Sequence, residues 1–349
     1  MSLETELIQK DIATGVWKPN LYLTNVSIAY LQNPETYTKA FKLFPMIPVS
    51  TSTGYYYKFD KATLTRDDVQ RKPQFGKVSP VIMGSKKDIY DCKVDQVIIG
   101  TDLISGLNYE RTNAFGINDP RKGKVIMATE KINIHLNVMF AQNFFQAGVW
   151  GQEVTGISTG TPSGSQFYQF NNANSDPIAL FDNLKDEIAR EGRRTPNKLA
   201  LGVNTFKALK QNPMILERIK YSGSSTDPAV VNVNVLAELF GINEVVVLDS
   251  VYNTAPLGAP AKMEYICDAN GALLLYAPNS PTVDEPSAGY TFSWDPTGEG
   301  KPIVFSQWLG ERGTHSEFIE GLCSYDMKKV CDDMAIYLKD CVSKEEVKK

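Results

Sequence analysis

The chain has 349 residues, of which 42% are hydrophobic and 22% charged, so it is long enough for roughly two folded domains with a substantial core. Its 36 basic and 40 acidic residues give a formal net charge of -4, which argues against a sequence-reading nucleic-acid-binding protein, because such proteins carry a basic face. The amino terminus has no apolar core of signal-peptide length, and no apolar run approaches the ~20 residues that span a bilayer. We therefore expect a soluble protein made in the cytosol.

The cysteines are odd in number, scattered, and without the close CxxC pairs of a zinc site. They are Cys92, Cys267, Cys323, Cys331 and Cys341. The pattern predicts small, buried apolar residues in a reducing compartment.

Residues 1–50 contain short, weakly periodic segments interrupted by Pro19, Pro34, Pro45 and Pro48. Such segments bury little by themselves. We expect extended, partner-dependent structure here, either a loosely docked terminal extension or an arm that lies on another subunit.

Alternating, aromatic-rich strand patterns begin after residue 50. The first covers Tyr55–Phe59, a polar charged stretch follows over Thr65–Lys77, and a second strand-like half runs from Lys86 to Ile99. This predicts a long two-stranded hairpin with a solvated tip. Because an isolated hairpin is marginal in water, we expect it to pack on a second chain; the alternative is a mobile surface insertion.

A long helix is predicted over about 120–147. Asp119 and Pro120 supply a capping acid and a proline at the first helical position, apolar residues follow at helical spacing, and Gly148 is a plausible stop. A strand is the competing interpretation, since apolar and polar residues alternate strictly over 132–138. Length and caps favour the helix.

Residues 151–174 are rich in Gly, Ser, Thr and Asn, which predicts a loop joining two domains. Asp176-Pro177 then begins a second helix that ends near Gly192. Its apolar face consists of Leu180, Phe181, Leu184 and Ile188.

The first of two similar strand-and-helix units follows. An apolar strand over Leu199–Val203 leads into a helix with Asn204 or Thr205 as its cap, and Lys210–Tyr221 is helical around Pro213.

In the second unit, a helix over Asn234–Phe240 ends at Gly241. The β-branched run Val245–Val247 then leads into a loop that carries Tyr252. Farther on, Asn270-Gly271 predicts a two-residue hairpin turn.

The last part of the chain begins with Pro- and Gly-punctuated loops over residues 279–302, around one short strand at Tyr290–Trp294. Ile303–Trp308 and Phe318–Val342 are predicted as further strands that return to the first domain. The first domain is therefore expected to be discontinuous.

The elements of residues 193–255, in their order, closely resemble the axial domain of tailed-bacteriophage major capsid proteins, which share the Hong Kong phage-type fold. The resemblance implies an α+β fold in four parts. These are an N-terminal arm (1–50), an extended β-hairpin loop (51–99), a peripheral domain (100–175 and 303–349) with a spine helix at about 120–147, and an axial α/β domain (176–302).

The function implied by the resemblance is that of a structural shell subunit, not an enzyme. Pentamers and hexamers of the chain would enclose packaged double-stranded DNA, with contacts near Tyr252–Ala261 and in the helix Asn234–Phe240. Further implied partners are a portal and DNA, the latter through nonspecific contacts. Because the match begins almost at Met1, any scaffolding protein is expected to be a separate chain. The implied location is the virion, and the host cytoplasm during assembly; no membrane is involved.

Some relatives join subunits through an isopeptide bond between a loop lysine and a neighbouring asparagine. The predicted loop carries Lys61, Lys72, Lys77, Lys86 and Lys87. Lysines on an exposed hairpin usually serve solubility, so the sequence favours a shell without this bond.

Candidate catalytic, cofactor-binding and metal-binding residues all fail a chemical test, so we expect none. His135 and His315, the two histidines, have no spacing that brings them together with other ligands. The run Gly298–Lys301 resembles the end of a phosphate-binding loop, but Pro302 replaces the Ser or Thr that would bind magnesium.

Adjacent acids at Asp67-Asp68 and Asp332-Asp333 cannot share a proton if they point to opposite faces of a strand. Two alternatives to a phage head remain. One is an encapsulin-like compartment with a protein cargo; the other, disfavoured by the missing constellations, is a two-domain α/β hydrolytic enzyme.

Overall fold

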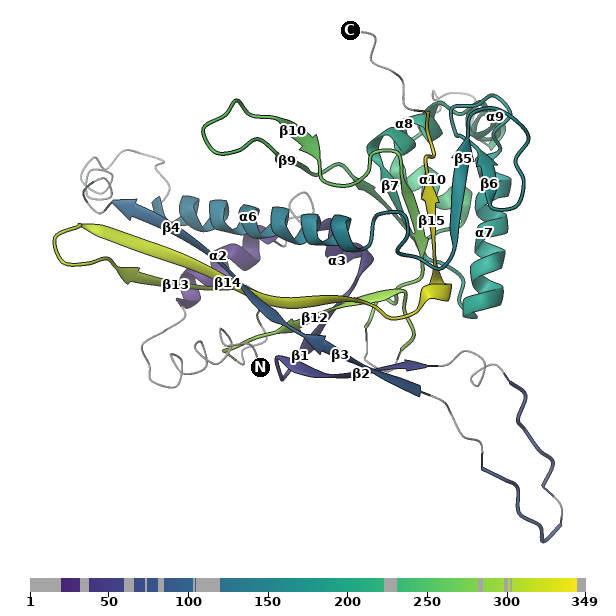
Figure 1. Ribbon diagram of the computed structural model, residues 1–349, viewed down its shortest axis with the longest axis horizontal. Coiled ribbons are helices and arrows are strands. Elements are labelled where there is room, and N and C mark those ends of the chain that lie inside the picture. The colour runs from purple at the N-terminus through teal and green to yellow at the C-terminus, as the bar shows by residue number, and fades with distance from the viewer. Residues whose placement is uncertain are drawn as a thin grey trace.

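The computed structural model describes residues 20–31, 38–59, 66–72, 74–80, 85–102, 104, 120–222, 231–281, 285–297, 301 and 303–343. Two β-sheets carry the fold, and one long helix, α6 (Pro120–Asn143), runs along the first sheet toward the second (Figure 1). This mixture of helix and sheet confirms the predicted α+β class. Among the described helices, none has the length and apolarity needed to cross a bilayer.

The first sheet has five strands and is organised around its longest strand, β14. The strands are β1 (Met46–Val49), β12 (Gly289–Trp294), β14 (Ser316–Lys329), β13 (Ile303–Leu309) and β4 (Lys93–Asp102). β14 pairs antiparallel with β4 along one edge and with β13 and β12 along the other, while β1 pairs parallel with β12. Pro48 in β1 is tolerated because β1 ends the sheet.

The second sheet has six strands of three to five residues each. Its order is β6 (Gln166–Tyr168), β5 (Glu153–Ile157), β15 (Ala335–Lys339), β11 (Ala272–Leu275), β7 (Lys198–Gly202) and β8 (Glu244–Leu248). Four helices accompany it: α7 (Pro177–Gly192), α8 (Val203–Gln211), α9 (Pro213–Ser222) and α10 (Val233–Phe240). Every residue of β7 and β11 is buried, as expected for strands covered on both faces.

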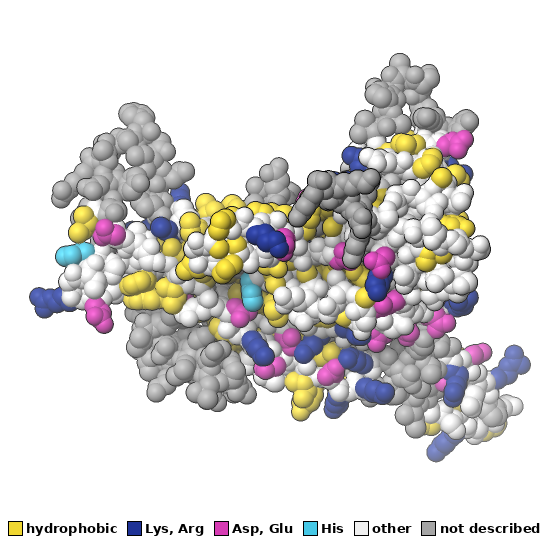
Figure 2. Space-filling model, turned by 45° about the horizontal axis from the view of Figure 1, so that its top comes forward, with side chains coloured by type: hydrophobic (Ala, Val, Ile, Leu, Met, Phe, Trp, Pro, Cys, Tyr) yellow, Lys and Arg dark blue, Asp and Glu magenta, His cyan; other side chains and the backbone are white. Residues whose placement is uncertain are grey.

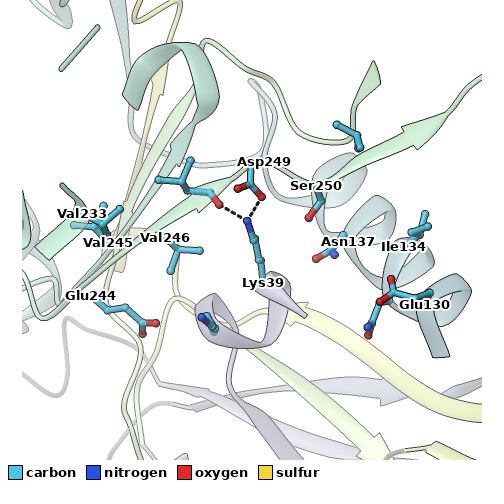
Figure 3. Close-up of a pocket in the computed structure, with 14 residues that line it drawn as sticks. Lys39, Glu130, Ile134, Asn137, Val233, Glu244, Val245, Val246, Asp249 and Ser250 are labelled. Atoms are coloured by element: carbon cyan, nitrogen blue, oxygen red, sulfur yellow. Dashed lines mark hydrogen bonds and ion pairs between the residues drawn. The ribbon is translucent and has the colours of Figure 1, made fainter. Parts of the chain in front are cut away.

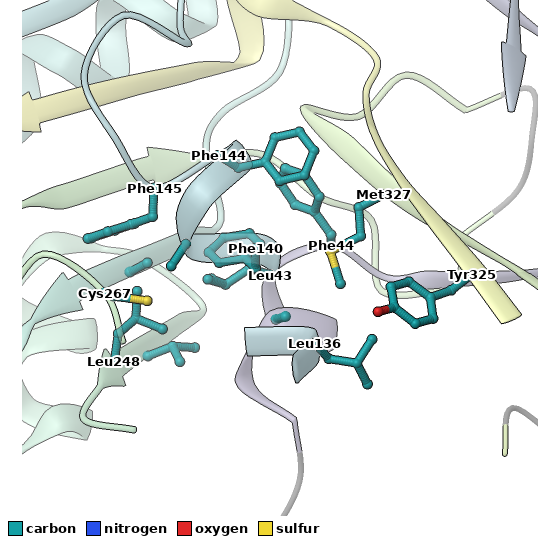
Figure 4. Packing of buried hydrophobic residues seen from close by; sticks show 14 of the residues in the cluster. Leu43, Phe44, Leu136, Phe140, Phe144, Phe145, Leu248, Cys267, Tyr325 and Met327 are labelled. Carbon is teal, nitrogen blue, oxygen red and sulfur yellow. The ribbon is translucent and has the colours of Figure 1, made fainter. Parts of the chain in front are cut away.

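Alternate residues of these strands enter two different hydrophobic clusters. Leu199, Leu201 and Leu274 pack with the helices, whereas Ala200 and Leu273 belong to the cluster that contains the end of α6. The cluster at the end of α6 also contains Ile319 and Cys323 of the five-stranded sheet. It therefore joins the two sheets through one hydrophobic core. Figure 4 shows its aromatic centre, where Phe44, Phe140 and Phe144 meet.

Residues 20–49 are partly helical, so the prediction of an extended segment is wrong over 21–31 and 39–43, while its dependence on a partner stays a prediction. They form α2 (Leu21–Leu31), α3 (Lys39–Leu43) and β1. α2 lies against α6 and β13, with Thr24 accepting a hydrogen bond from the Phe305 backbone N–H (3.1 Å). These contacts fix α2 to the body of the subunit. Residues 1–19 and 32–37 lie outside the described residues.

The predicted hairpin after residue 50 is confirmed as the antiparallel pair β2 (Thr53–Phe59) and β3 (Ser85–Asp91), which projects from the body (Figure 1). It is shorter than expected, because the chain leaves it after Asp91 and β4 joins the five-stranded sheet. The segments 60–65, 73 and 81–84 are not among the described residues.

The long predicted helix is confirmed and the competing strand over 132–138 is wrong, but α6 ends at Asn143 and not at 147. The N–H groups of Phe144 and Phe145 both donate to the Phe140 carbonyl, which closes the last turn, and Gly148 has a positive φ of 86°. The predicted cap, Asp119, falls outside the described residues.

The predicted linker over 151–174 is wrong, because it contains β5 and β6, which extend the six-stranded sheet beside β15. Thr155 of β5 pairs with Lys339, far away in sequence, so no local pattern marks the strand.

The start of α7 is confirmed: the Asp176 carboxylate accepts hydrogen bonds from the N–H groups of Ile178 and Ala179 at 3.1 Å each. The predicted caps of α8 are wrong. Its N-cap is Gly202, and the N–H groups of Asn204 and Thr205 donate to the Ala269 carbonyl instead.

Gly241 ends α10 in the left-handed conformation, with φ 60°, as predicted. The loop expected after β8 is in fact a hairpin, β9 (Val251–Asn253) and β10 (Met263–Tyr265). The predicted two-residue hairpin at Asn270-Gly271 is wrong: the Gly271 N–H closes a turn on the Asp268 carbonyl (3.4 Å), but β11 pairs with β7 and β15.

Strand pairing crosses the predicted domain limits. β12, placed in the 176–302 part, lies in the five-stranded sheet, and β15, placed in the 303–349 part, lies in the six-stranded sheet. The chain therefore passes between the sheets more often than expected. The short 3-10 helix η1 (Asp332–Met334) makes the last passage.

Candidate functional site

The exposed surfaces that suit contact with another chain lie on two hairpins and one sheet end. The β2–β3 hairpin is fixed to the body through one face only. On that face Tyr56 and Tyr90 pack on Phe292 of β12, with ring centroids 5.3 and 4.7 Å away. Cys92, Tyr290 and other buried residues complete this small cluster.

Asp88 holds the hairpin's two strands together on the same face. Its carboxylate accepts hydrogen bonds from Lys58 Nζ (2.6 Å), the Tyr56 hydroxyl (3.1 Å) and the Ile89 N–H (2.9 Å). The Lys58 bond, followed by the backbone bond, lowers the pKa of Asp88 to about 2. The carboxylate therefore stays charged at neutral pH.

The opposite, outer face of the hairpin is exposed and apolar. Tyr55 lies opposite Ile89 in the strand register, and their exposed fractions are 67% and 48%. Tyr57 lies opposite Lys87, whose ammonium is 5.7 Å from the ring centroid. This group, Tyr55, Tyr57, Lys87 and Ile89, is called the outer hairpin face below.

The β9–β10 hairpin is more exposed still, since Met263, Glu264 and Tyr265 all face solvent. Leu257 at its tip is fully exposed and Val251 is 44% exposed. A two-stranded ribbon without a covered face is marginal in water, so a partner surface would stabilise it. Figure 1 shows it projecting above α6.

The third surface is the free end of the five-stranded sheet. Trp308 and Leu309 end β13 and are exposed, with Trp308 stacked on Phe318 (5.7 Å). Figure 2 adds that hydrophobic side chains gather along the middle of the molecule over α6, where Met127 is 49% exposed. Lys and Arg side chains are scattered over the projection at the lower right of the same view.

A polar groove of about 600 Å³ separates α6 from β8 and the start of β9 (Figure 3). Glu130 and Asn137 line it from α6, and Glu244 and Asp249 line it from the β8 side. Lys39 of α3 crosses it: its Nζ donates to the Val247 carbonyl (2.8 Å) and pairs with Asp249.

The two histidines considered for catalysis lie in different parts of the described structure. His135 on α6 lies 3.5 Å from Asp95 of β4, and His315 is an exposed turn residue with φ 47°. Asp295 accepts hydrogen bonds from the N–H groups of Thr297 and Lys301 and so organises a turn; Gly298–Gly300 lie outside the described residues. No group of three metal-ligating side chains occurs in the described part of the chain.

The cysteines are free thiols, four of them buried, as predicted, and Cys331 partly so. Burial raises the pKa of the Cys92 and Cys267 thiols to about 12, which removes their nucleophilic thiolate form at neutral pH. The adjacent acids Asp332 and Asp333 begin η1, where Asp332 pairs with Lys329 (2.6 Å).

The exposed regions agree only in part with the contact regions expected from the sequence, and the contacts themselves stay a prediction. Residues 252–261 do lie on an exposed hairpin, whereas Leu236 and Phe240 of the 234–240 helix are buried against α7 and the sheet. The outer hairpin face could have been found, because aromatic residues occupy both faces of β2. No sequence pattern marks Lys39 as a residue that joins two elements.

Comparison with known proteins finds similarity to phage capsid proteins. No protein-family model matches it. The major capsid protein of Burkholderia phage BcepMu is 26% identical to it over 293 residues, which is 81% of this chain and 84% of that protein.

Solved structures share the fold. A phage-related protein from Bordetella bronchiseptica matches with a TM-score of 0.69 at 18% identity, covering 93% of this chain and 98% of that one. The capsid of cyanophage P-SCSP1u matches at 0.50 and 12% identity, covering 86% and 87%. The SrpI encapsulin of Synechococcus elongatus also matches at 0.50, with 11% identity, covering 91% and 94%. The chain thus resembles a phage major capsid protein in sequence and shares the fold of phage capsid proteins.

Proposed function

We propose that the chain is the structural subunit of a phage head, which assembles with copies of itself into a closed shell around packaged double-stranded DNA. The observation that carries the proposal is the relationship to a phage major capsid protein over 81% of the chain, together with the shared fold. Pentamers and hexamers would be the building units, as in icosahedral shells with repeated heterologous contacts.

The exposed surfaces support this role. The outer hairpin face, the β9–β10 hairpin and the sheet end at Trp308 expose apolar side chains in three directions, which suits a subunit with several neighbours. Many weak contacts of this kind add up when a shell closes.

The finer assignments belong to the same proposal. Residues 53–91 would act as the extended loop that overlaps a neighbour, the five-stranded sheet with α6 as the peripheral part, and the six-stranded sheet with its helices as the axial part. A portal, a scaffolding protein and nonspecific phosphate contacts with DNA would complete the head, and the subunit itself would be non-enzymatic.

The test is expression of the chain alone, followed by light scattering and electron microscopy of the purified material. Closed shells of regular size support the proposal. A monodisperse monomer that stays monomeric at high concentration and after addition of phage scaffolding and portal proteins contradicts it.

An encapsulin-like compartment is the second candidate, favoured by the fold shared with the SrpI encapsulin. The sequence relationship to a capsid protein makes it the weaker one. Particles isolated from the cells in which the gene occurs separate the two: nuclease-resistant double-stranded DNA inside supports the head, and an enclosed enzyme supports the compartment.

A further inference from the structure

Helix α3 is the element that bridges α6 and the six-stranded sheet across the groove. On the α6 side, the Thr38 hydroxyl donates to Asn133 Oδ1 (2.6 Å), and the Ala40 N–H donates to Asn137 Oδ1 (3.3 Å). Phe44, just after α3, packs against Phe140 of α6 at a centroid distance of 5.3 Å. These contacts fix α3 to α6.

Two lysines join α3 to the six-stranded sheet. Lys198, buried at the start of β7, donates from Nζ to the Lys42 carbonyl in the last turn of α3. Lys39 lies on α3 itself, and its ammonium contacts the Val247 carbonyl and the Asp249 carboxylate at the end of β8 (Figure 3).

The position of the Lys39 contact matters because β8 leads directly into the β9–β10 hairpin. Asp249 is two residues before Val251, and the base of the hairpin is closed by the Ile266 N–H donating to the Ser250 carbonyl (2.9 Å). The hairpin has no covered face of its own, so its direction depends on how its base is held.

The exposure of the Lys39–Asp249 pair indicates a local role and not a large contribution to the stability of the whole subunit. The side chains of Lys39 and Asp249 are 23% and 61% exposed, and an ion pair this exposed contributes little to overall stability. Its effect on a single marginal hairpin is proportionally larger, because local opening needs far less free energy than global unfolding.

We propose that Lys39 is a positioning residue: it fixes the base of the β9–β10 hairpin relative to α6, and so sets the direction in which the hairpin meets a second copy of the chain. The part that concerns a second copy rests on the proposed shell function. The positioning itself can be measured in the unassembled subunit.

The experiment compares wild-type full-length protein with Lys39→Met, which keeps the side-chain stem but loses the charge and donor, and with Lys39→Arg, which keeps both. The matched control is Lys262→Met, which removes the exposed Lys262–Glu264 pair (2.6 Å) inside the same hairpin. Hydrogen exchange of residues 249–266 and thermal unfolding are measured on subunits, and the size distribution of particles on assembled material.

We expect Lys39→Met to exchange roughly fivefold faster over 249–266 while its unfolding midpoint stays within about 3 °C of wild type. Its particles should be fewer and more variable in diameter, with Lys39→Arg and Lys262→Met close to wild type. Equal exchange in Lys39→Met and wild type overturns the inference, and so does an equal increase in Lys262→Met. If wild type forms no particles, the shell function fails, and the exchange data still decide the positioning role.

Discussion

At the scale of residues, Phe44 shows how one side chain joins separate elements. It is fully buried and contacts Phe140 and Phe144 of the α6 end and Trp150, with centroid distances of 5.3, 4.8 and 6.4 Å. A Cβ added at Gly289 of β12 would lie 2.4 Å from the Phe44 ring, so the strand needs glycine at this position. The residue thus lies where both sheets and α6 meet.

We predict that Phe44→Ala lowers the free energy of unfolding by about 3–5 kcal/mol, since it removes a large buried ring from a packed site. Urea unfolding of the unassembled subunit measures this. Phe75→Ala is the matched control: Phe75 is fully exposed, and the same chemical change there should cost less than about 0.5 kcal/mol. A Phe44→Ala loss below 1 kcal/mol would contradict the packing described.

Asp88 gives a prediction that depends on pH. Its pKa, lowered to about 2 chiefly by Lys58, is below the ordinary value of 3.8, so its stabilising effect is present above pH 4 and disappears as the pH falls to about 2. Because the pair is half exposed, the effect should be no more than about 1 kcal/mol.

Asp88→Asn should therefore be less stable than wild type at pH 7, and this difference should shrink toward pH 2. The measurement is denaturant unfolding at several pH values. Lys58→Gln should show the same loss, and the double variant should lose no more than either single one. Additive losses at pH 7 would show that the two groups act separately.

At the scale of elements, helices with clear end signals were predictable. Asp176-Pro177 and Gly241 act locally, through the N–H groups of the first turn and a left-handed φ, so the sequence alone places those ends. The existence of α6 was predictable from its length and spacing, but its end was not, because Phe144 and Phe145 turn into the core after Asn143.

Elements held by distant partners were not predictable. α2 contains Thr24 and Ser27, which look like surface residues, but both are buried and bond to Phe305 and Thr129. β5 and β6 form in a Gly- and Ser-rich stretch because β15 offers a free edge. The outer hairpin face could be predicted from the alternation of side chains in β2. The contacts of Lys39 could not, because they form only where β8 approaches α3, and no local sequence pattern encodes that approach.

The N-cap of α7 gives a prediction at this scale. Asp176→Ala should lower the free energy of unfolding by about 1 kcal/mol, because two N–H groups of the first turn lose their acceptor. Asp176→Ser keeps an acceptor and should recover most of this loss. The cap would be unimportant if both variants unfolded at the same urea concentration as wild type.

At the scale of the whole molecule, the subunit combines one continuous core with projecting hairpins. The cluster around Phe44 extends from Ile319 in the first sheet to Leu273 in the second, so the body should move as one unit. By contrast, the β2–β3 hairpin is held through one face and the β9–β10 hairpin at its base. Assembly contacts should therefore depend on side chains that contribute little to the folding of the subunit.

Two neighbouring tyrosines in β2 test this separation. Tyr55 is 67% exposed on the outer hairpin face, and Tyr56 is 2% exposed against Phe292. We predict that Tyr55→Ser changes the free energy of unfolding by less than about 0.5 kcal/mol but raises the protein concentration needed for shell formation roughly tenfold, because interface tyrosines often contribute more than 1.4 kcal/mol to binding. Tyr56→Ser should instead destabilise the subunit itself by about 3 kcal/mol. Sedimentation assays of assembly and urea unfolding on both variants measure the two effects, and normal assembly of Tyr55→Ser would show that the outer hairpin face does not touch a second copy.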